Sequence, residues 1–170
     1  GIEYIINIAF NKETALSSLE LAKKHQHIFA TVGFHPHDAQ DFDAELVKKH
    51  AREKKVVAIG EIGLDFFRNL SPYPVQREVF ANQAHLAVEY DLPVVVHDRQ
   101  AHQECYNILQ QQGVKEAVFH CFSGDIIFAQ QVLDAGWMMS FTGSITYSNS
   151  HLDDPWAQGG SHRPDRKSVV

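Results

Sequence analysis

The sequence predicts an α/β fold with a parallel sheet, and a barrel of the (β/α)8 TIM type in preference to a doubly wound sheet. Short runs rich in Val, Ile and Ala alternate with longer helical stretches, which is the pattern of repeated β/α units. The runs VVAIG, PVVVH and AVFH are apolar throughout, as in strands that are buried on both faces. Side chains able to bind a metal follow four successive runs, namely His35 and His37, then Glu61, His97 and His120. A barrel collects its functional residues at successive strand ends in this way.

The elements follow in order along the chain. Strands are expected at 4–9, 28–33, 56–60, 93–97, 117–120 and 137–141, and helices at 12–25, 39–53, 73–90, 99–112 and 124–135. The clearest helix is 73–90, whose apolar face recurs at positions i, i+3, i+4 and i+7. Gly113 and Gly136 stand where helix C-terminal glycines are expected. The chain contains no GxGxxG or GxxxxGK[ST] sequence, which disfavours a nucleotide-binding doubly wound sheet.

Composition limits the possible classes of protein. The 170 residues correspond to one domain, and no apolar run of about 18 residues suggests a membrane span. The net charge is −6 without a cluster of Lys or Arg, so a phosphate ligand would need positive charge from another source. The two cysteines form no CxxC pair, which favours a reducing, cytoplasmic location. No obligate protein partner is indicated.

The last twenty residues differ from the rest. Residues 151–170 contain two prolines, a glycine pair and no apolar periodicity. We therefore assign residues 1–150 to the domain and expect 151–170 to be a non-homologous tail, either disordered or artefactual.

Three residues at equivalent strand ends predict a metal site. Glu61 follows VVAIG, where an unpaired carboxylate would be costly; pairing with Arg or capping a helix would be the structural explanation. His97 ends PVVVH and His120 ends AVFH, and either one alone is more often a hydrogen-bonded core histidine. Since three such residues recur on three successive strands, ligation of a hydrolytic metal is the better explanation.

Further polar residues lie near the same strand ends. His35 and His37 flank a proline, and on an extended segment they would point the same way. They could chelate a metal, contact a substrate or cap the next helix. Asp65, Asp98 and Arg99 follow strand ends and could orient ligands or bind an anion, but for each residue taken singly a surface salt bridge is the better explanation.

Taken together and in order, several motifs resemble one known family. GFHPH, VVAIGEIGLDFF, a helix carrying Gln76, Phe80, Gln83 and Ala87, LPVVVHDRQA and FHCFSG are similar to the TatD-like metal-dependent hydrolases from about residue 2 to about residue 149. The resemblance implies a (β/α)8 barrel of the amidohydrolase kind and two divalent metal ions, such as Zn, Mg or Mn. It also implies phosphodiester hydrolysis as a deoxyribonuclease, with DNA as the substrate.

The resemblance also implies roles for individual residues. Glu61 would bridge the metals and be catalytic, with His97 and His120 as further metal ligands. His35 and His37 would lie on the substrate side, and we add Arg99 as a third candidate substrate-binding residue.

The resemblance covers only part of the family pattern. The family's HxH pair on strand 1 and its strand-8 Asp have no counterpart in residues 1–150, so we expect strands 2–7 of a barrel truncated at both ends and no activity from this polypeptide alone. One alternative is another amidohydrolase-type barrel acting on an amide or ester, disfavoured because Glu61 stands where such enzymes usually carry a carbamylated Lys. The other alternative is a non-catalytic metal-binding fragment.

Overall fold

Six parallel strands lie side by side in their order along the chain in the computed structural model, which describes residues 1–143. The strands are β1 (Ile5–Asn7), β2 (Ile28–Val32), β3 (Val56–Asp65), β4 (Val94–Arg99), β5 (Ala117–Phe119) and β6 (Met138–Met139). The helices are α1 (Lys12–Lys24), the 3-10 helix η1 (Pro36–Asp41), α2 (Ala44–His50), α3 (Tyr73–Glu89), α4 (His102–Gln112) and α5 (Ile126–Asp134). The predicted tail at 151–170 lies outside the described residues.

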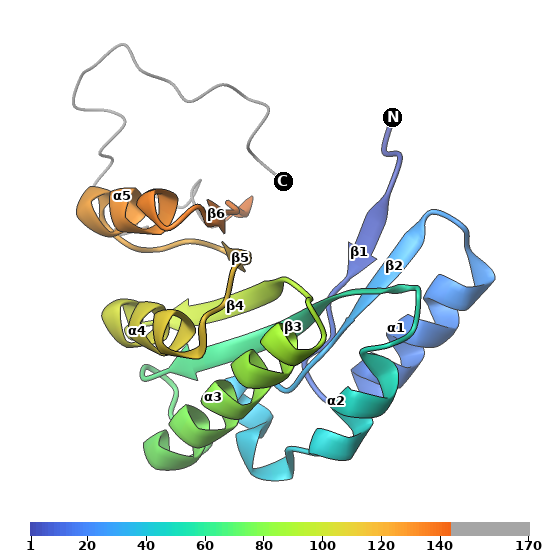
Figure 1. Cartoon of the computed structure of the whole chain (residues 1–170), viewed down its shortest axis with the longest axis horizontal. Helices are drawn as coiled ribbons and strands as arrows, with labels where there is room; N and C mark the ends of the chain where they lie inside the picture. Colours follow the sequence, from blue (N-terminus) through green and yellow to red (C-terminus); the bar gives the residue numbers. More distant parts are fainter. Residues whose placement is uncertain (144–170) are drawn as a thin grey trace.

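The sheet curls into half a barrel, and the helices follow its outer side (Figure 1). Each strand pairs with the next in parallel register, so all strand C-termini lie at the same end of the sheet. This architecture confirms the predicted α/β class and the barrel curvature. None of the helices within residues 1–143 has the length and apolar character needed to cross a bilayer.

Strand β3 is the main correction to the predicted strands. It does not end at Gly60 but continues to Asp65, so Glu61 lies inside the strand and not after it. The register of β3 against β4 shifts between Ile59 and Ile62, as at a β-bulge. The predicted strand ended at Gly60, whereas Gly60 and Gly63 let the irregular backbone of the longer strand pass close to its neighbours.

The helix predicted at 39–53 is also wrong. The segment forms two elements, η1 and α2, which meet at Phe42 and Asp43. The Asp43 carboxylate accepts a hydrogen bond from the backbone N–H of Leu46 at 3.0 Å and so begins α2. A new N-cap inside the segment explains the break.

Helix α3 was predicted correctly and lies against β3 (Figure 1). Its buried side chains are Gln76, Val79, Phe80, Gln83, Ala84, Leu86 and Ala87. Two of these seven are polar amides, and both lie at the end of the sheet where the candidate site forms, as described below.

Candidate metal centre

Three predicted site residues converge from three neighbouring strands. His35 follows β2, Glu61 lies in β3 and His97 lies in β4. One ligand atom from each of these residues lies within 4.8 Å of the others, and this is the one group of three or more such side chains found this close together among residues 1–143. The cluster therefore occupies the C-terminal end of the half-barrel, where a barrel of this kind places its functional residues.

The position of Glu61 is fixed by its backbone. Its N–H donates to the carbonyl of Ala9, just beyond β1, at 2.6 Å. The buried hydroxyl of Thr31 accepts from the Ala9 N–H at 2.9 Å and donates to the Gly60 carbonyl at 2.5 Å. One hydroxyl on β2 thereby joins the chain after β1 to the irregular part of β3, at the residue before Glu61.

Close packing of β3 against β4 brings the carboxylates to His97. Gly63 has a φ of 146°, and a Cβ added there would lie 1.9 Å from the carbonyl oxygen of His97. A Cβ on Gly60 would lie 2.6 Å from the Cβ of Val95. Only glycine permits this backbone conformation and this approach, so the glycines of the GEIGLD motif are requirements of the site geometry.

His97 lies between two carboxylates. Its Nδ1 is 3.6 Å from Oε1 of Glu61, and its Nε2 is 3.1 Å from Oδ2 of Asp65. Burial lowers the pKa of His97, but the interactions with Glu61 and then Asp65 outweigh it and raise the pKa above the usual value. For Glu61, burial raises the pKa, whereas the hydrogen bond and charge of His97 bring it below the usual value.

Asp65 is the central hydrogen-bond acceptor of the site. Its side chain is fully buried, so the expected surface salt bridge is wrong. Oδ1 accepts the backbone N–H groups of Phe67 at 3.0 Å and Arg68 at 2.7 Å. Oδ2 accepts Nε2–H of His37 at 2.8 Å and Nε2–H of His97. Burial raises the pKa of Asp65, but the N–H of Arg68 and the two histidines lower it overall, which favours the ionised acceptor.

His35 closes the cluster on the η1 side. His35 has an extended backbone, as the proline after it predicts, and is the N-cap of η1, where its Nδ1 accepts the backbone N–H of His37 at 3.1 Å. His37 lies inside η1, so the expectation that both histidines share one extended segment is wrong. The centre of the His35 ring lies 4.1 Å from the centre of the His97 ring and 4.3 Å from the centre of the His37 ring. Burial, followed by the charge of His97, lowers the pKa of His35 to about 3. The ring is therefore neutral near pH 7, and since Nδ1 accepts, its proton is on Nε2.

His120 and Arg99 lie outside the closest group. His120 follows β5, and its Nδ1 is 3.0 Å from the hydroxyl of Ser140. It is near enough for its charge to contribute to lowering the pKa of Glu61. Arg99 ends β4 with its guanidinium 4.0 Å from the ring centre of Phe67. The structure thus brings His35, Glu61 and His97 together, with His37 held beside them through Asp65.

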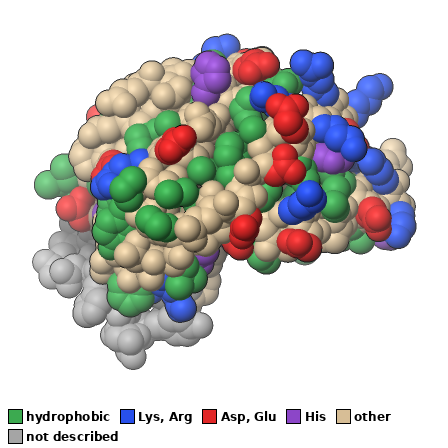
Figure 2. Space-filling model, turned by 90° about the horizontal axis from the view of Figure 1, so that it is seen from below, with side chains coloured by type: hydrophobic (Ala, Val, Ile, Leu, Met, Phe, Trp, Pro, Cys, Tyr) green, Lys and Arg blue, Asp and Glu red, His purple; other side chains and the backbone are tan. Residues whose placement is uncertain are grey.

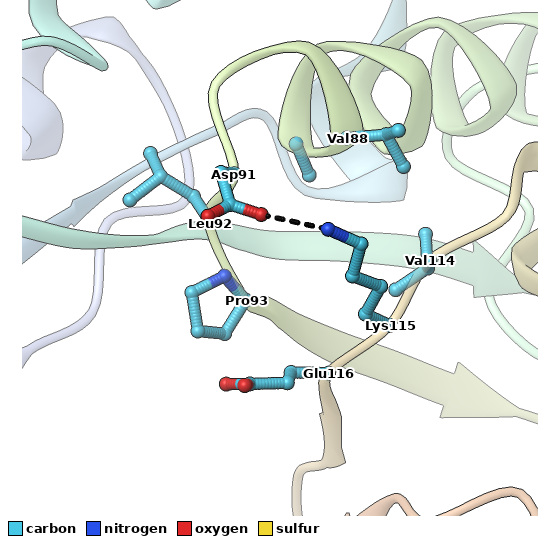
Figure 3. A pocket seen from close by; sticks show the side chains of 8 residues that line it. Val88, Asp91, Leu92, Pro93, Val114, Lys115 and Glu116 are labelled. Carbon is cyan, nitrogen blue, oxygen red and sulfur yellow. Dashed lines mark hydrogen bonds and ion pairs between the residues drawn. The ribbon is translucent and has the colours of Figure 1, made fainter.

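The donor set fits a divalent cation. Imidazole and carboxylate groups together suit ions such as Zn or Mn. Asp65 occupies Nε2 of His97, which leaves Nδ1 facing Glu61, as in the carboxylate–histidine–metal arrangement that orients a ligating ring. A pocket lined in part by Asp91, Pro93, Lys115 and Glu116 lies at the other end of the sheet, at the N-terminal ends of β4 and β5 (Figure 3). That end of a barrel usually serves stability and not chemistry.

On the face shown in Figure 2, Lys and Arg side chains gather toward one edge and are elsewhere interspersed with Asp and Glu. Over the whole chain acidic side chains outnumber Lys and Arg, and the net charge is −6. Positive charge for an anionic ligand would therefore have to come mainly from a bound cation.

The chain matches known proteins along most of its length. The family model described as "TatD related DNase" matches residues 1–158. The chain is 35% identical over 154 residues to "Uncharacterized metal-dependent hydrolase YabD" of Bacillus subtilis, which covers 88% of this chain and 60% of that protein. It is 35% identical over 150 residues to "3'-5' ssDNA/RNA exonuclease TatD" of Klebsiella pneumoniae, with 85% and 57% covered. The chain spans about three fifths of the length of these curated relatives.

Solved structures share the fold. The crystal structure of YJJV, a TatD homolog from Escherichia coli, superposes with a TM-score of 0.80 at 32% identity, covering 86% of this chain and 59% of that chain. A hydrolase of the TatD family from Entamoeba histolytica gives a TM-score of 0.75 at 28% identity, with 84% and 52% covered. A phosphotriesterase homology protein from Escherichia coli, at 17% identity and a TM-score of 0.60, shares the fold alone. The half-barrel is therefore part of a (β/α)8 barrel.

Proposed function

The chain belongs to the TatD-related DNase family, and from this membership we propose that it forms the ligand-bearing part of a divalent-metal-dependent phosphodiesterase acting on DNA. The observation that carries the proposal is the convergence of His35, Glu61 and His97 within 4.8 Å at the C-terminal end of the sheet. A 3'-5' exonuclease action on single strands, as in the name of the Klebsiella relative, is the form we propose. The free cysteine Cys105 and the absence of CxxC support a reducing, cytoplasmic setting.

Two divalent ions are proposed, held around Glu61. Its carboxylate has two oxygens and can serve both ions, with Nδ1 of His97 on one side and His120 from the end of β5 on the other. When bound, such ions make a water molecule acidic enough to attack phosphorus and stabilise charge on the phosphate oxygens. The charges of both His97 and His120 already act on Glu61, which supports a site shared between these strands.

Asp65 is the proposed positioning residue for His97. Its ionised carboxylate accepts Nε2–H, so Nδ1, which faces Glu61, is the nitrogen left to bind a cation once its own proton is lost. The same oxygen accepts Nε2–H of His37 at 2.8 Å. One buried carboxylate therefore sets the tautomer of both rings.

His35 is the proposed hydrogen-bond donor to the substrate. Its Nδ1 is occupied by the N–H of His37, so Nε2–H is the group that it can present to a phosphate oxygen. A neutral donor keeps this property throughout the pH range near 7, because the pKa of the ring is about 3. His37 and Arg99 are proposed to contact the substrate further out, with the guanidinium of Arg99 offering a bidentate partner for a phosphate.

The metal site can be tested on this chain. Isothermal titration with Mn²⁺ should show binding that Glu61→Gln weakens by about 100-fold or more, because the ligand charge is lost while the shape is kept. Asp41→Asn, which removes the charge of an exposed residue, is the matched control. Equal Mn²⁺ binding by the wild-type chain and Glu61→Gln would contradict the site.

Catalysis is best tested in a complete barrel. In a chimera, residues 1–143 of this chain replace the matching segment of the Klebsiella pneumoniae exonuclease. We expect metal-dependent shortening of single-stranded DNA, lost in Glu61→Gln and not in Asp41→Asn. A chimera that binds Mn²⁺ but hydrolyses amide or carboxylic-ester substrates and not DNA would identify another amidohydrolase-type enzyme.

A further inference from the structure

We propose that helix α3 is the positioning element of the site, and that Gln76 and Gln83 hold in place the backbone segments carrying His35, His37 and Asp65. That these segments carry metal-binding and substrate-binding residues rests on the proposed function. The hydrogen bonds made by the two glutamines do not depend on that function.

Gln83 fixes the segment that carries His35. Its Oε1 accepts the backbone N–H of Phe34 at 2.8 Å, and its Nε2 donates to the carbonyl of the same residue at 2.9 Å. Phe34 lies two residues beyond the end of β2 at Val32, and it directly precedes His35. A side chain of α3 thus pairs with both backbone groups of Phe34 where the strand no longer does.

Gln76 fixes Asp65 and the turn behind it. Its Oε1 accepts the backbone N–H of Asp65 at 2.9 Å, while Nε2 donates to the carbonyls of Ser71 at 2.7 Å and Asp65 at 3.3 Å. The hydroxyl of Ser71 in turn donates to the carbonyl of His37 at 2.9 Å. Through this chain of bonds Gln76 is linked to the carboxylate that orients His97 and to the backbone of His37.

Hydrophobic packing alone does not explain the two glutamines on the buried face of α3. Both are completely buried, and the other buried side chains of α3 are Val79, Phe80, Ala84, Leu86 and Ala87, which are all apolar. An amide in such a position is costly unless its hydrogen bonds are made, and an apolar side chain of similar volume would pack without that condition.

The places where these hydrogen bonds are made explain why two polar residues lie on the buried face of α3. Gln76 and Gln83 are seven residues apart, which is two helical turns and about 10 Å along one face. From that face each amide bonds backbone at or beside the site residues. A single rigid helix therefore sets the distance between the His35 segment and the Asp65 segment, and with it the approach of His35 to His97.

The test compares Gln76→Met and Gln83→Met with Leu86→Ala. The Met variants keep the side-chain length and remove the hydrogen bonds, whereas Leu86 is a buried apolar residue of the same helix whose truncation costs stability without touching the site backbone. The first measurement is the ¹⁵N spectrum of the imidazoles in the metal-free chain. We expect altered His37 and His97 signals in Gln76→Met and altered His35 signals in Gln83→Met, with the wild-type spectrum retained in Leu86→Ala. Unchanged imidazole signals in both Met variants, or equal changes in Leu86→Ala, would overturn the proposal.

The second measurement is the dissociation constant for Mn²⁺. Gln76→Met should raise it by about 10–100-fold, because it loosens Asp65, the outer partner of the proposed ligand His97. Leu86→Ala should change it by about twofold or less, as expected for independent sites. If the wild-type chain binds no Mn²⁺, the proposed function fails, while the imidazole spectra still decide whether the glutamines position the rings.

A buried amide can also be tested in the unmodified chain, should a Met variant fail to fold. The side-chain amide protons of Gln76 and Gln83 should exchange with solvent far more slowly than those of the exposed Gln40 and Gln111. Their shifts should also respond to added Zn²⁺ more strongly than those of Gln40 and Gln111. Exchange as fast as at the exposed glutamines would refute the proposal that Gln76 and Gln83 hold these backbone segments in place.

Discussion

Replacing Asp65 by Asn changes one atom at the centre of the site and should disable metal binding while the fold persists. The Asn carbonyl would keep the hydrogen bonds from Phe67 and Arg68, which now reach Oδ1 of Asp65 at 3.0 and 2.7 Å. The amide NH₂ would then face Nε2 of both His37 and His97. An NH₂ group cannot accept a hydrogen bond from Nε2–H, so each ring must move its proton from Nε2 to Nδ1 and accept the amide hydrogen at Nε2.

The proton shift determines the size of the effect. On His97 the proton would occupy Nδ1, the atom 3.6 Å from Glu61, so the lone pair offered to a cation would be lost. We expect the dissociation constant for Mn²⁺ to rise by about 10–100-fold. Two hydrogen bonds to a buried carboxylate also become bonds to a neutral amide, which should lower the free energy of unfolding by about 2–3 kcal/mol.

Isothermal titration and urea unfolding measure these two quantities. Asp41→Asn, which removes the same charge from an exposed position, should leave both within error of the wild-type values. An Asp65→Asn chain that binds Mn²⁺ as tightly as the wild type would refute the reasoning. A ¹⁵N spectrum in which His97 still carries its proton on Nε2 would refute it as well.

Three further predictions concern the scaffold. Thr31→Val keeps the shape but leaves a buried N–H and a carbonyl without their bridging hydroxyl, so urea unfolding should show a loss of about 1–3 kcal/mol; an unchanged midpoint would contradict this. Gly63→Ala places a Cβ 1.9 Å from the carbonyl of His97 at a positive φ, and a loss of about 3 kcal/mol or more is expected, which a wild-type melting temperature would exclude. The hydrogen bond and then the charge of Asp98 raise the pKa of His102, so the pair stabilises the fold below about pH 6.5 and loses this contribution as the pH rises through the raised pKa. His102→Gln should therefore cost about 1–2 kcal/mol near pH 5.5 and less near pH 9, and a cost independent of pH would contradict the assignment.

The sheet and three members of the cluster could be predicted because each depends on local sequence. Apolar runs such as PVVVH are long enough to be buried strands, and the residue that follows a parallel strand lies at a common end of the sheet. His35 and His97 could therefore be placed together without knowledge of the contacts between strands. Glu61 was placed at the correct end of the sheet, although its position within β3 was predicted wrongly.

The role of Asp65 could not be predicted, because it depends on how two strands approach each other. Its position after IGL allows a surface salt bridge as readily as a buried acceptor. The choice is made by the close approach of β3 to β4 at Gly63 and by the two histidines that reach it from η1 and β4. A signal lay in the run VVAIGEIGLD, because a carboxylate that ends a largely apolar strand needs buried partners.

The same contacts explain how a chain of net charge −6 could act on the proposed polyanionic substrate. In the metal-free chain the negative charges of Glu61 and Asp65 surround His97, whose raised pKa shows that the pair of carboxylates favours a positive charge between them. His35 contributes none, since it is neutral. A divalent cation bound at Nδ1 of His97 would replace the proton on that nitrogen and would bring two positive charges in place of one. The acidic residues thus concentrate positive charge at one point, and they do so at the end of the sheet where the neutral donor of His35 is also fixed.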